Sequence, residues 1–392
     1  MHWNCLRHRW GSLHFPALRS YLPALLLILV ASASCEQTGV LTLGTTMEGD
    51  RIFDITGMSG DGSVIVGTMS FKRTTAKSIT APFSTPLETQ AFRWTAAGGI
   101  EPLGFIGPAN FNTSKAEAIS ANGRVIIGES SSPDDIQPFR WTPTGRFAPL
   151  NTPPDSFARV RVADVSSDGS VVVGNATVNE VQARAFRWTP FTGYQILDVP
   201  FLLESDTIQA NFVSDNGRVI VGHISDGRSS RIFRWTAGSG AVVLDNPTDR
   251  SSRSKALDLS GDGSTIVGFF GGTGEAEPFR WTQAEGFVNL GGLPGELVKG
   301  MPRATSFNGS VVVGMTAVGE SDFSYTPFIW DARNGMRTIL SLLSEEDAAL
   351  LKNWRLESAD LISADGRTIA GLDRNSEGVV DVWVVRLSHP LL

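Results

Sequence analysis

Residues 116–142 read AEAISANGRVIIGESSSPDDIQPFRWT, and this stretch contains the unit from which most of the chain is built. Asn122-Gly123 tolerates the positive φ angles that a two-residue type I′ hairpin turn requires, so it predicts a tight turn. Residues 116–120 before it and Val125–Gly128 after it read as the paired strands a and b. Pro138–Thr142 and 147–150 read as two further strands, c and d, so the unit predicts a four-stranded sheet.

The same unit recurs seven times along the chain. A Trp returns at spacings of 47, 47, 47, 46, 49 and 53 residues, and five of the seven stand in the tripeptide Phe-Arg-Trp. Each unit has an Asp-Gly or Asn-Gly pair, and five residues after the glycine of that pair comes another glycine. The repeated tryptophans are Trp94, Trp141, Trp188, Trp235, Trp281, Trp330 and Trp383.

A period of ~40–50 residues with four strands per unit is typical of a β-propeller. We therefore expect an all-β chain that folds as a single seven-bladed propeller over residues 35–392. The last unit ends in strand c at Trp383–Leu387 and has no strand d of its own. The segment Gly39–Gly44 resembles the strand d of another unit, Gly286–Gly291, so we expect the N-terminal segment to close the ring as the outer strand of the last blade.

Residues 1–34 have the pattern of a secretory signal peptide. Three arginines precede the apolar run Leu22–Val30, and small residues follow it. Two interpretations remain open: cleavage after Ala31-Ser32-Ala33, or a lipoprotein signal in which Cys35 becomes the lipidated first residue. Cys35 is otherwise an ordinary residue of the terminus. Either signal predicts export to the extracellular space, the cell surface or the periplasm, with an outer-membrane lipoprotein as the lipidated form.

The composition excludes several classes of function. The net charge is −7, and residues 35–392 carry 30 Lys and Arg against 40 Asp and Glu, which argues against nucleic acid as a partner. Only two Cys, Cys5 and Cys35, exist, and only His223 and His389 lie beyond residue 34. We therefore expect no disulfide scaffold, no metal site and no cofactor.

The repeat resembles the bacterial extracellular repeats named HAF after their His-Ala-Phe motif. Ala91–Trp94, Ala185–Trp188 and Ile119–Gly128 carry the resemblance, which covers nearly all of residues 39–387. It implies an exported, often surface-linked protein with no settled catalytic role. The last two units depart from the pattern: Asp381 stands at the Phe position of the last unit, and Ile329 and Val382 stand at the Arg position of the last two.

Several residues invite a functional interpretation, and each also has a structural one. The repeated arginines suggest an anion-binding ring, but we expect their stems to pack on the blades and their heads to pair with carboxylate or carbonyl groups. The Asp-Gly turns resemble a calcium loop, although each offers a single ligand. Tyr194 and Tyr325 lack a sialidase motif, and His223 and His389 lack a nucleophile elbow. Four loop carboxylates remain as candidates for glycosidase chemistry: Asp134, Asp135, Glu204 and Asp206.

Function is expected on the face of the ring that carries the b–c and d–a connections, because these vary most in length. Residues 68–90 form the longest of them and suggest a flap, or simply an insertion. Ser344–Asp347 predicts a structural helix start, with Leu351 and Trp354 packed on the ring. We expect a monomeric, non-enzymatic scaffold that binds carbohydrate or an envelope protein through this face. The alternative is a hydrolase or lyase that acts on extracellular polysaccharide with loop carboxylates.

Overall fold

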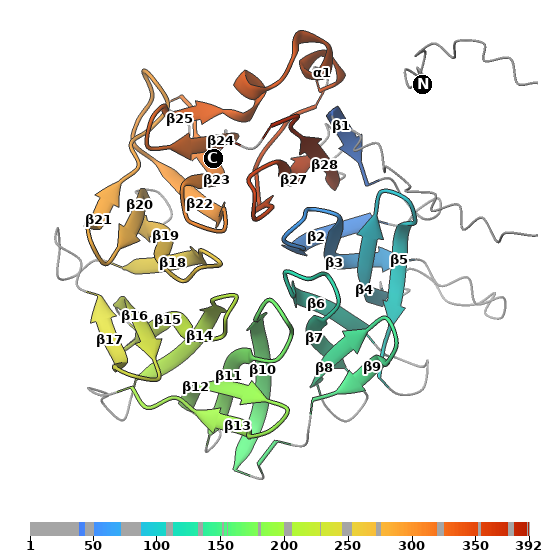
Figure 1. The fold of residues 1–392 in the computed structure, drawn as a ribbon, viewed down its shortest axis with the longest axis vertical. Helices are drawn as coiled ribbons and strands as arrows, with labels where there is room; N and C mark the ends of the chain where they lie inside the picture. The colour runs from blue at the N-terminus through green and yellow to red at the C-terminus, as the bar shows by residue number, and fades with distance from the viewer. Residues whose placement is uncertain are drawn as a thin grey trace, which may run out of the picture. The chain divides into compact units, whose positions relative to one another are not determined.

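The computed structural model confirms a seven-bladed β-propeller (Figure 1). It describes residues 39–43, 51–71, 88–106, 113–131, 136–150, 153–154, 156–178, 182–199, 206–227, 229–244, 253–271, 276–319, 325–351, 354–374, 380–389 and 391. Each blade is a four-stranded antiparallel sheet whose strand a lies innermost, and in the first six blades strands a to d follow one another in the chain. The signal segment and Cys35 lie outside the described residues.

The strands follow the predicted units closely. Those of the first three blades are β2 (Arg51–Met58), β3 (Val64–Phe71), β4 (Glu88–Thr95), β5 (Gly99–Gly104), β6 (Thr113–Ile119), β7 (Ile126–Ser131), β8 (Ile136–Thr142), β9 (Arg146–Pro149), β10 (Phe157–Val165), β11 (Val172–Val178), β12 (Gln182–Thr189) and β13 (Gly193–Ile196). Those of the next three blades are β14 (Thr207–Val213), β15 (Val219–Ser225), β16 (Ser230–Thr236), β17 (Gly240–Leu244), β18 (Ser254–Leu259), β19 (Thr265–Phe270), β20 (Glu277–Thr282), β21 (Gly286–Asn289), β22 (Gly300–Thr305), β23 (Val311–Ala317), β24 (Tyr325–Asp331) and β25 (Gly335–Thr338).

The last blade combines the two ends of the chain, as predicted. β26 (Leu361–Ile362), β27 (Thr368–Arg374) and β28 (Val380–Arg386) supply its inner strands, and β1 (Gly39–Thr42) pairs with β28 as the outer strand. Figure 1 shows β1 in blue beside the red β28. Leu43, just after β1, is 5% exposed and packs in the core between the last and first blades. The N-terminal segment therefore closes the ring by backbone pairing and apolar contact.

The a–b turns differ from the predicted type I′ geometry. Gly62 N–H donates to the Ser59 carbonyl at 2.8 Å, so the four-residue turn begins at Ser59 and places Asp61-Gly62 at its third and fourth positions. Gly62 has φ of 69°, a value at which a side chain is strained, and this combination fits a type I turn followed by a left-handed glycine. The predicted Asp-Gly turn exists, but the prediction placed its centre one residue too late.

The repeated glycine of strand b is explained by its neighbours. Gly128 pairs with Phe139, and a side chain at Gly128 would overlap the Lys115 carbonyl and meet the Phe139 ring. In the last blade the corresponding Gly371 pairs with Trp383. Trp383 therefore occupies the Phe position, and the predicted alignment of the last unit was wrong by two residues.

Helical structure is limited to η1 (Ile339–Leu342) and α1 (Glu345–Leu350) in the described residues. Ser344 caps α1 as predicted: its hydroxyl accepts a hydrogen bond from Asp347 N–H at 3.1 Å. Leu351 and Trp354 then pack on the core of the last two blades. Neither described helix is long and apolar enough to cross a membrane.

Candidate functional site

Six of the seven innermost strands contain a β-bulge at the same place. In β6, Ala116 pairs with Gly128 and Ala118 with Ile127, so Glu117 has no partner across the ladder. A bulge re-aims its side chain, and in an innermost strand this brings the residue to the central channel. The six bulge residues are Thr56, Glu117, Ala163, Asn211, Leu257 and Arg303, and Asp360 has the matching place in the seventh blade.

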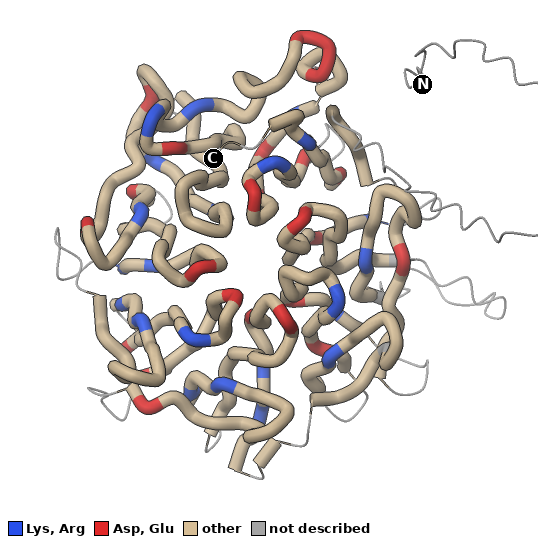
Figure 2. Tube along the Cα trace, viewed as in Figure 1, with Lys and Arg blue, Asp and Glu red and all other residues tan. Residues whose placement is uncertain are grey.

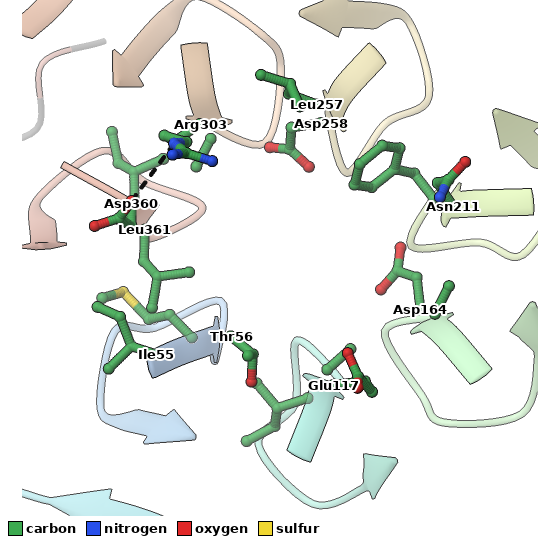
Figure 3. Close-up of a pocket in the computed structure, with 18 of the residues that line it drawn as sticks. Ile55, Thr56, Glu117, Asp164, Asn211, Leu257, Asp258, Arg303, Asp360 and Leu361 are labelled. Atoms are coloured by element: carbon green, nitrogen blue, oxygen red, sulfur yellow. Dashed lines mark ion pairs between the residues drawn. The ribbon is translucent and has the colours of Figure 1, made fainter. Parts of the chain in front are cut away.

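These residues line a cavity of about 400 Å³ in the channel (Figure 3). The volume falls in the range of ~300–1,000 Å³ that is usual for small-molecule sites. The lining combines hydroxyl, amide, carboxyl and guanidinium groups with the apolar side chains of Phe212, Leu257 and Leu361. All seven blades contribute, so the cavity exists only in the closed ring.

The cavity is predominantly acidic. Asp54, Glu117, Asp164, Asp258 and Asp360 line it against a single cation, Arg303. Arg303 Nε lies 3.7 Å from Asp360 Oδ1. Burial raises the pKa of Asp54 and Asp360, and nearby cations oppose that rise. Figure 2 shows further acidic residues on turns at the inner ends of several blades.

Two of these carboxyls also join neighbouring blades. Asp164 Oδ2 accepts a hydrogen bond from Val213 N–H of the next blade at 2.8 Å, and Asp258 Oδ2 accepts one from Thr305 N–H at 2.7 Å. Burial raises the pKa of each to about 7, against the lowering effect of these backbone hydrogen bonds. Both groups therefore change charge near neutral pH.

His223 lies behind the cavity wall and contacts it through Asn211. Its Nδ1 is 2.8 Å from Asn211 Oδ1, and its Nε2 accepts a hydrogen bond from Ala256 N–H at 2.8 Å. Burial, with a smaller effect from Lys255, lowers the pKa of His223 to about 4. His223 is therefore neutral at physiological pH and links two blades.

The turn residues serve the fold. In the second blade, Ser120 donates to Asn122 Oδ1 at 2.8 Å and accepts from Val125 N–H at 2.9 Å. The equivalent Ser, Asp and Asn side chains of the other blades make the same contacts.

Among the repeated arginines, Arg280 donates to the Gly309 carbonyl at 3.1 Å and pairs with Glu285 at 2.7 Å.

The other sequence candidates do not converge. Tyr194 packs edge-on against Phe157 and Phe186, and burial raises its pKa. Tyr325 lies in β24, and His389 is exposed near the C-terminus. Asp206 is buried beside Arg184, which donates to its carbonyl. Asp134, Asp135, Glu204 and residues 72–87 of the predicted flap lie outside the described residues.

Within the described ranges, no group of three or more His, Cys, Asp or Glu side chains is arranged to hold a metal ion. The cavity wall comes from strands, whereas the sequence analysis placed function on the b–c and d–a loops. One signal in the sequence marks the wall: each bulge residue stands five positions before the Asp or Asn of its turn. The residue types at these positions vary, so the repeat pattern does not reveal them.

No family model and no curated protein matches the chain, so the resemblance to HAF repeats stays a prediction. Among solved structures, TolB from Acinetobacter baumannii matches 71% of this chain and 63% of its own length, with 14% identity and a TM-score of 0.45. An oligogalacturonate lyase in complex with manganese matches 89% and 93%, with 11% identity and a TM-score of 0.57. A structure from a study of two prolyl endopeptidases matches 86% and 50%, with 9% identity and a TM-score of 0.56. The match thus covers less than two thirds of the length of TolB, and it covers half of the length of the peptidase. At these identities the likeness shows the propeller fold alone.

Proposed function

We propose that this protein is an exported, non-enzymatic scaffold that binds carbohydrate in its central channel, beside the a–b turns that follow the bulge residues. The observation that carries the proposal is the 400 Å³ cavity whose wall mixes planar polar groups with apolar side chains. Carboxyl, amide and guanidinium groups exchange hydrogen bonds with sugar hydroxyls, while Phe212, Leu257 and Leu361 suit the apolar faces of a sugar ring.

The test is binding of the purified protein to cellobiose, maltose and lactose by calorimetry. Leu257→Trp introduces a larger side chain into the cavity, and we expect it to abolish binding. Phe191→Trp is the matched control, because Phe191 is 96% exposed on a c–d turn. Binding that survives Leu257→Trp and is lost when residues 72–87 are replaced by a Gly/Ser loop would move the site to the loops. No binding to any of the three sugars would refute carbohydrate as the ligand, and cross-linking in the envelope would then seek a protein partner.

A second candidate is a polysaccharide hydrolase or lyase. The observation that favours it is the pair Asp164 and Asp258, because groups that titrate near neutrality suit acid–base catalysis. Both carboxyls already accept interblade hydrogen bonds, which favours a structural role. Incubation with polysaccharides decides the question: products released by the wild type and not by Asp164→Asn/Asp258→Asn would establish the enzyme.

A further inference from the structure

His223 has only one proton position compatible with its surroundings. Its side chain is 7% exposed in β15, and its Nε2 lies 2.8 Å from the backbone nitrogen of Ala256. A backbone N–H only donates, so Nε2 must present its lone pair. The lowered pKa keeps the ring neutral, and the single proton is therefore on Nδ1.

This proton fixes the orientation of the Asn211 amide. His223 Nδ1–H donates to the side-chain oxygen of Asn211 at 2.8 Å, which leaves the two hydrogens of Asn211 Nδ2 for other partners. Asn211 is the bulge residue of β14 and lines the cavity. In Figure 3 it lies between Asp164 and Asp258 on one side of the channel.

We infer that His223 is a positioning residue that holds the Asn211 amide as a hydrogen-bond donor to the channel, and that the ligand therefore presents a hydroxyl at this wall. The inference rests on the proposed function and specifies what the site recognises. The amide NH₂ demands an acceptor. The flanking Asp164 and Asp258, whose pKa burial raises to about 7, demand a donor in their ionised form. An ammonium group cannot accept and a phosphate dianion cannot donate, whereas a hydroxyl does both.

Asn175 in the third blade shows what a different residue does at the position equivalent to His223. Asn175 has the equivalent position in blade three, directly after the repeated glycine, and its Oδ1 accepts from Ala210 N–H at 2.9 Å. Ala210 corresponds to Ala256 in the next blade. An Asn at this position therefore suffices for the contact between blades. The imidazole adds the second nitrogen, which reaches Asn211.

The first test is the protonation state of His223 in the full protein, read from ¹⁵N chemical shifts of labelled histidine at pH 6–8. We expect a neutral ring with the proton on Nδ1. The Asn211→Asp variant keeps an acceptor oxygen beside His223 Nδ1. Its His223 ¹⁵N chemical shifts therefore serve as the reference for the wild-type shifts. A proton on Nε2, or a charged ring in the wild type, would overturn the inference without any ligand.

The second test is affinity for the same three disaccharides. Asn211→Asp replaces the donor with an isosteric acceptor, and we expect it to weaken binding by about 10-fold or more, since it leaves a ligand oxygen unpaired. His223→Asn preserves the interblade contact and frees the amide to rotate, so it should weaken binding less, by about 3-fold. Wild-type binding that neither variant changes would overturn this inference and leave the proposed function intact. Absence of wild-type binding would overturn both.

Discussion

The backbone N–H of Ala364 in the last blade donates to the carbonyl oxygen of Gly60 in the first blade at 2.9 Å. This bond completes a circle, because the a–b turn of every blade donates one backbone hydrogen bond to the next. The seven bonds are Gly60 to Ala121, Asn122 to Ser167, Ser167 to Asp215, Asp215 to Gly261, Asp262 to Phe307, Phe307 to Ala364 and Ala364 to Gly60. One rim of the channel is thus a ring of main-chain bonds that does not depend on side-chain identity.

Leu43→Ala should destabilise the closed ring. Leu43 is 5% exposed in the core between the last and first blades, and truncation of a buried Leu costs about 2–5 kcal/mol. Leu350→Ala on α1 is the control, since Leu350 is 63% exposed. Urea unfolding measures both. An equal loss in the two variants would contradict the role of the N-terminal segment in closure.

Gly128→Ala should destabilise the second blade by about 3 kcal/mol or more, because overpacking displaces backbone as well as side chains. The added methyl would overlap the Lys115 carbonyl and lie 2.7 Å from the Phe139 ring. Gly238→Ala has nothing within 4 Å of the new methyl and should change stability little. Chemical denaturation compares the two. Equal midpoints would show that strand b moves freely away from strand a.

Ser120→Ala should lower the free energy of unfolding by about 1–3 kcal/mol, the cost of a buried group left without its partner. The hydroxyl accepts the buried Val125 N–H and donates to Asn122. Ser120→Thr retains the hydroxyl and should recover part of the loss. Thermal unfolding gives the comparison, and wild-type stability for Ser120→Ala would assign the turn to its backbone bonds alone.

Stability should fall as the pH rises from about 5 to 8. Asp164 and Asp258 have a pKa of about 7 in the folded protein, and an unfolded Asp titrates near 3.9. The folded state therefore binds more protons between these values, and the stabilisation is lost as the pH rises through the folded pKa. Each group contributes on the order of 3 kcal/mol between pH 5 and pH 8.

Asp164→Asn/Asp258→Asn should flatten this dependence, because an amide does not titrate. Denaturant unfolding at pH 5 and pH 8 measures the slope, and Glu346→Gln on the exposed side of α1 serves as the control. A double variant with the wild-type slope would show that other carboxyls, such as Asp54 or Asp360, carry the pH dependence.

Local chemistry explains what the sequence predicted correctly. The Asp-Gly and Asn-Gly turns, the strands around Phe-Arg-Trp and the capping Ser344 depend on neighbours within a few residues. Gly39–Thr42 was identified as a missing strand because its pattern matches Gly286–Asn289, and the registers of the two strands agree. The turn type and the position of Trp383 were wrong, because both depend on which residues pair across a ladder.

The sequence by itself determined the architecture, since seven copies of one four-stranded unit cannot bury their sheet faces except against one another. Only the tertiary structure decided where the central cavity lies. Thr56, Asn211 and Arg303 have no common chemistry and are far apart in the chain, and a bulge in each of their three strands directs them into one channel. The His223–Asn211 contact arises in the same way, because residues 12 positions apart meet only when β14 and β15 pair around the bulge.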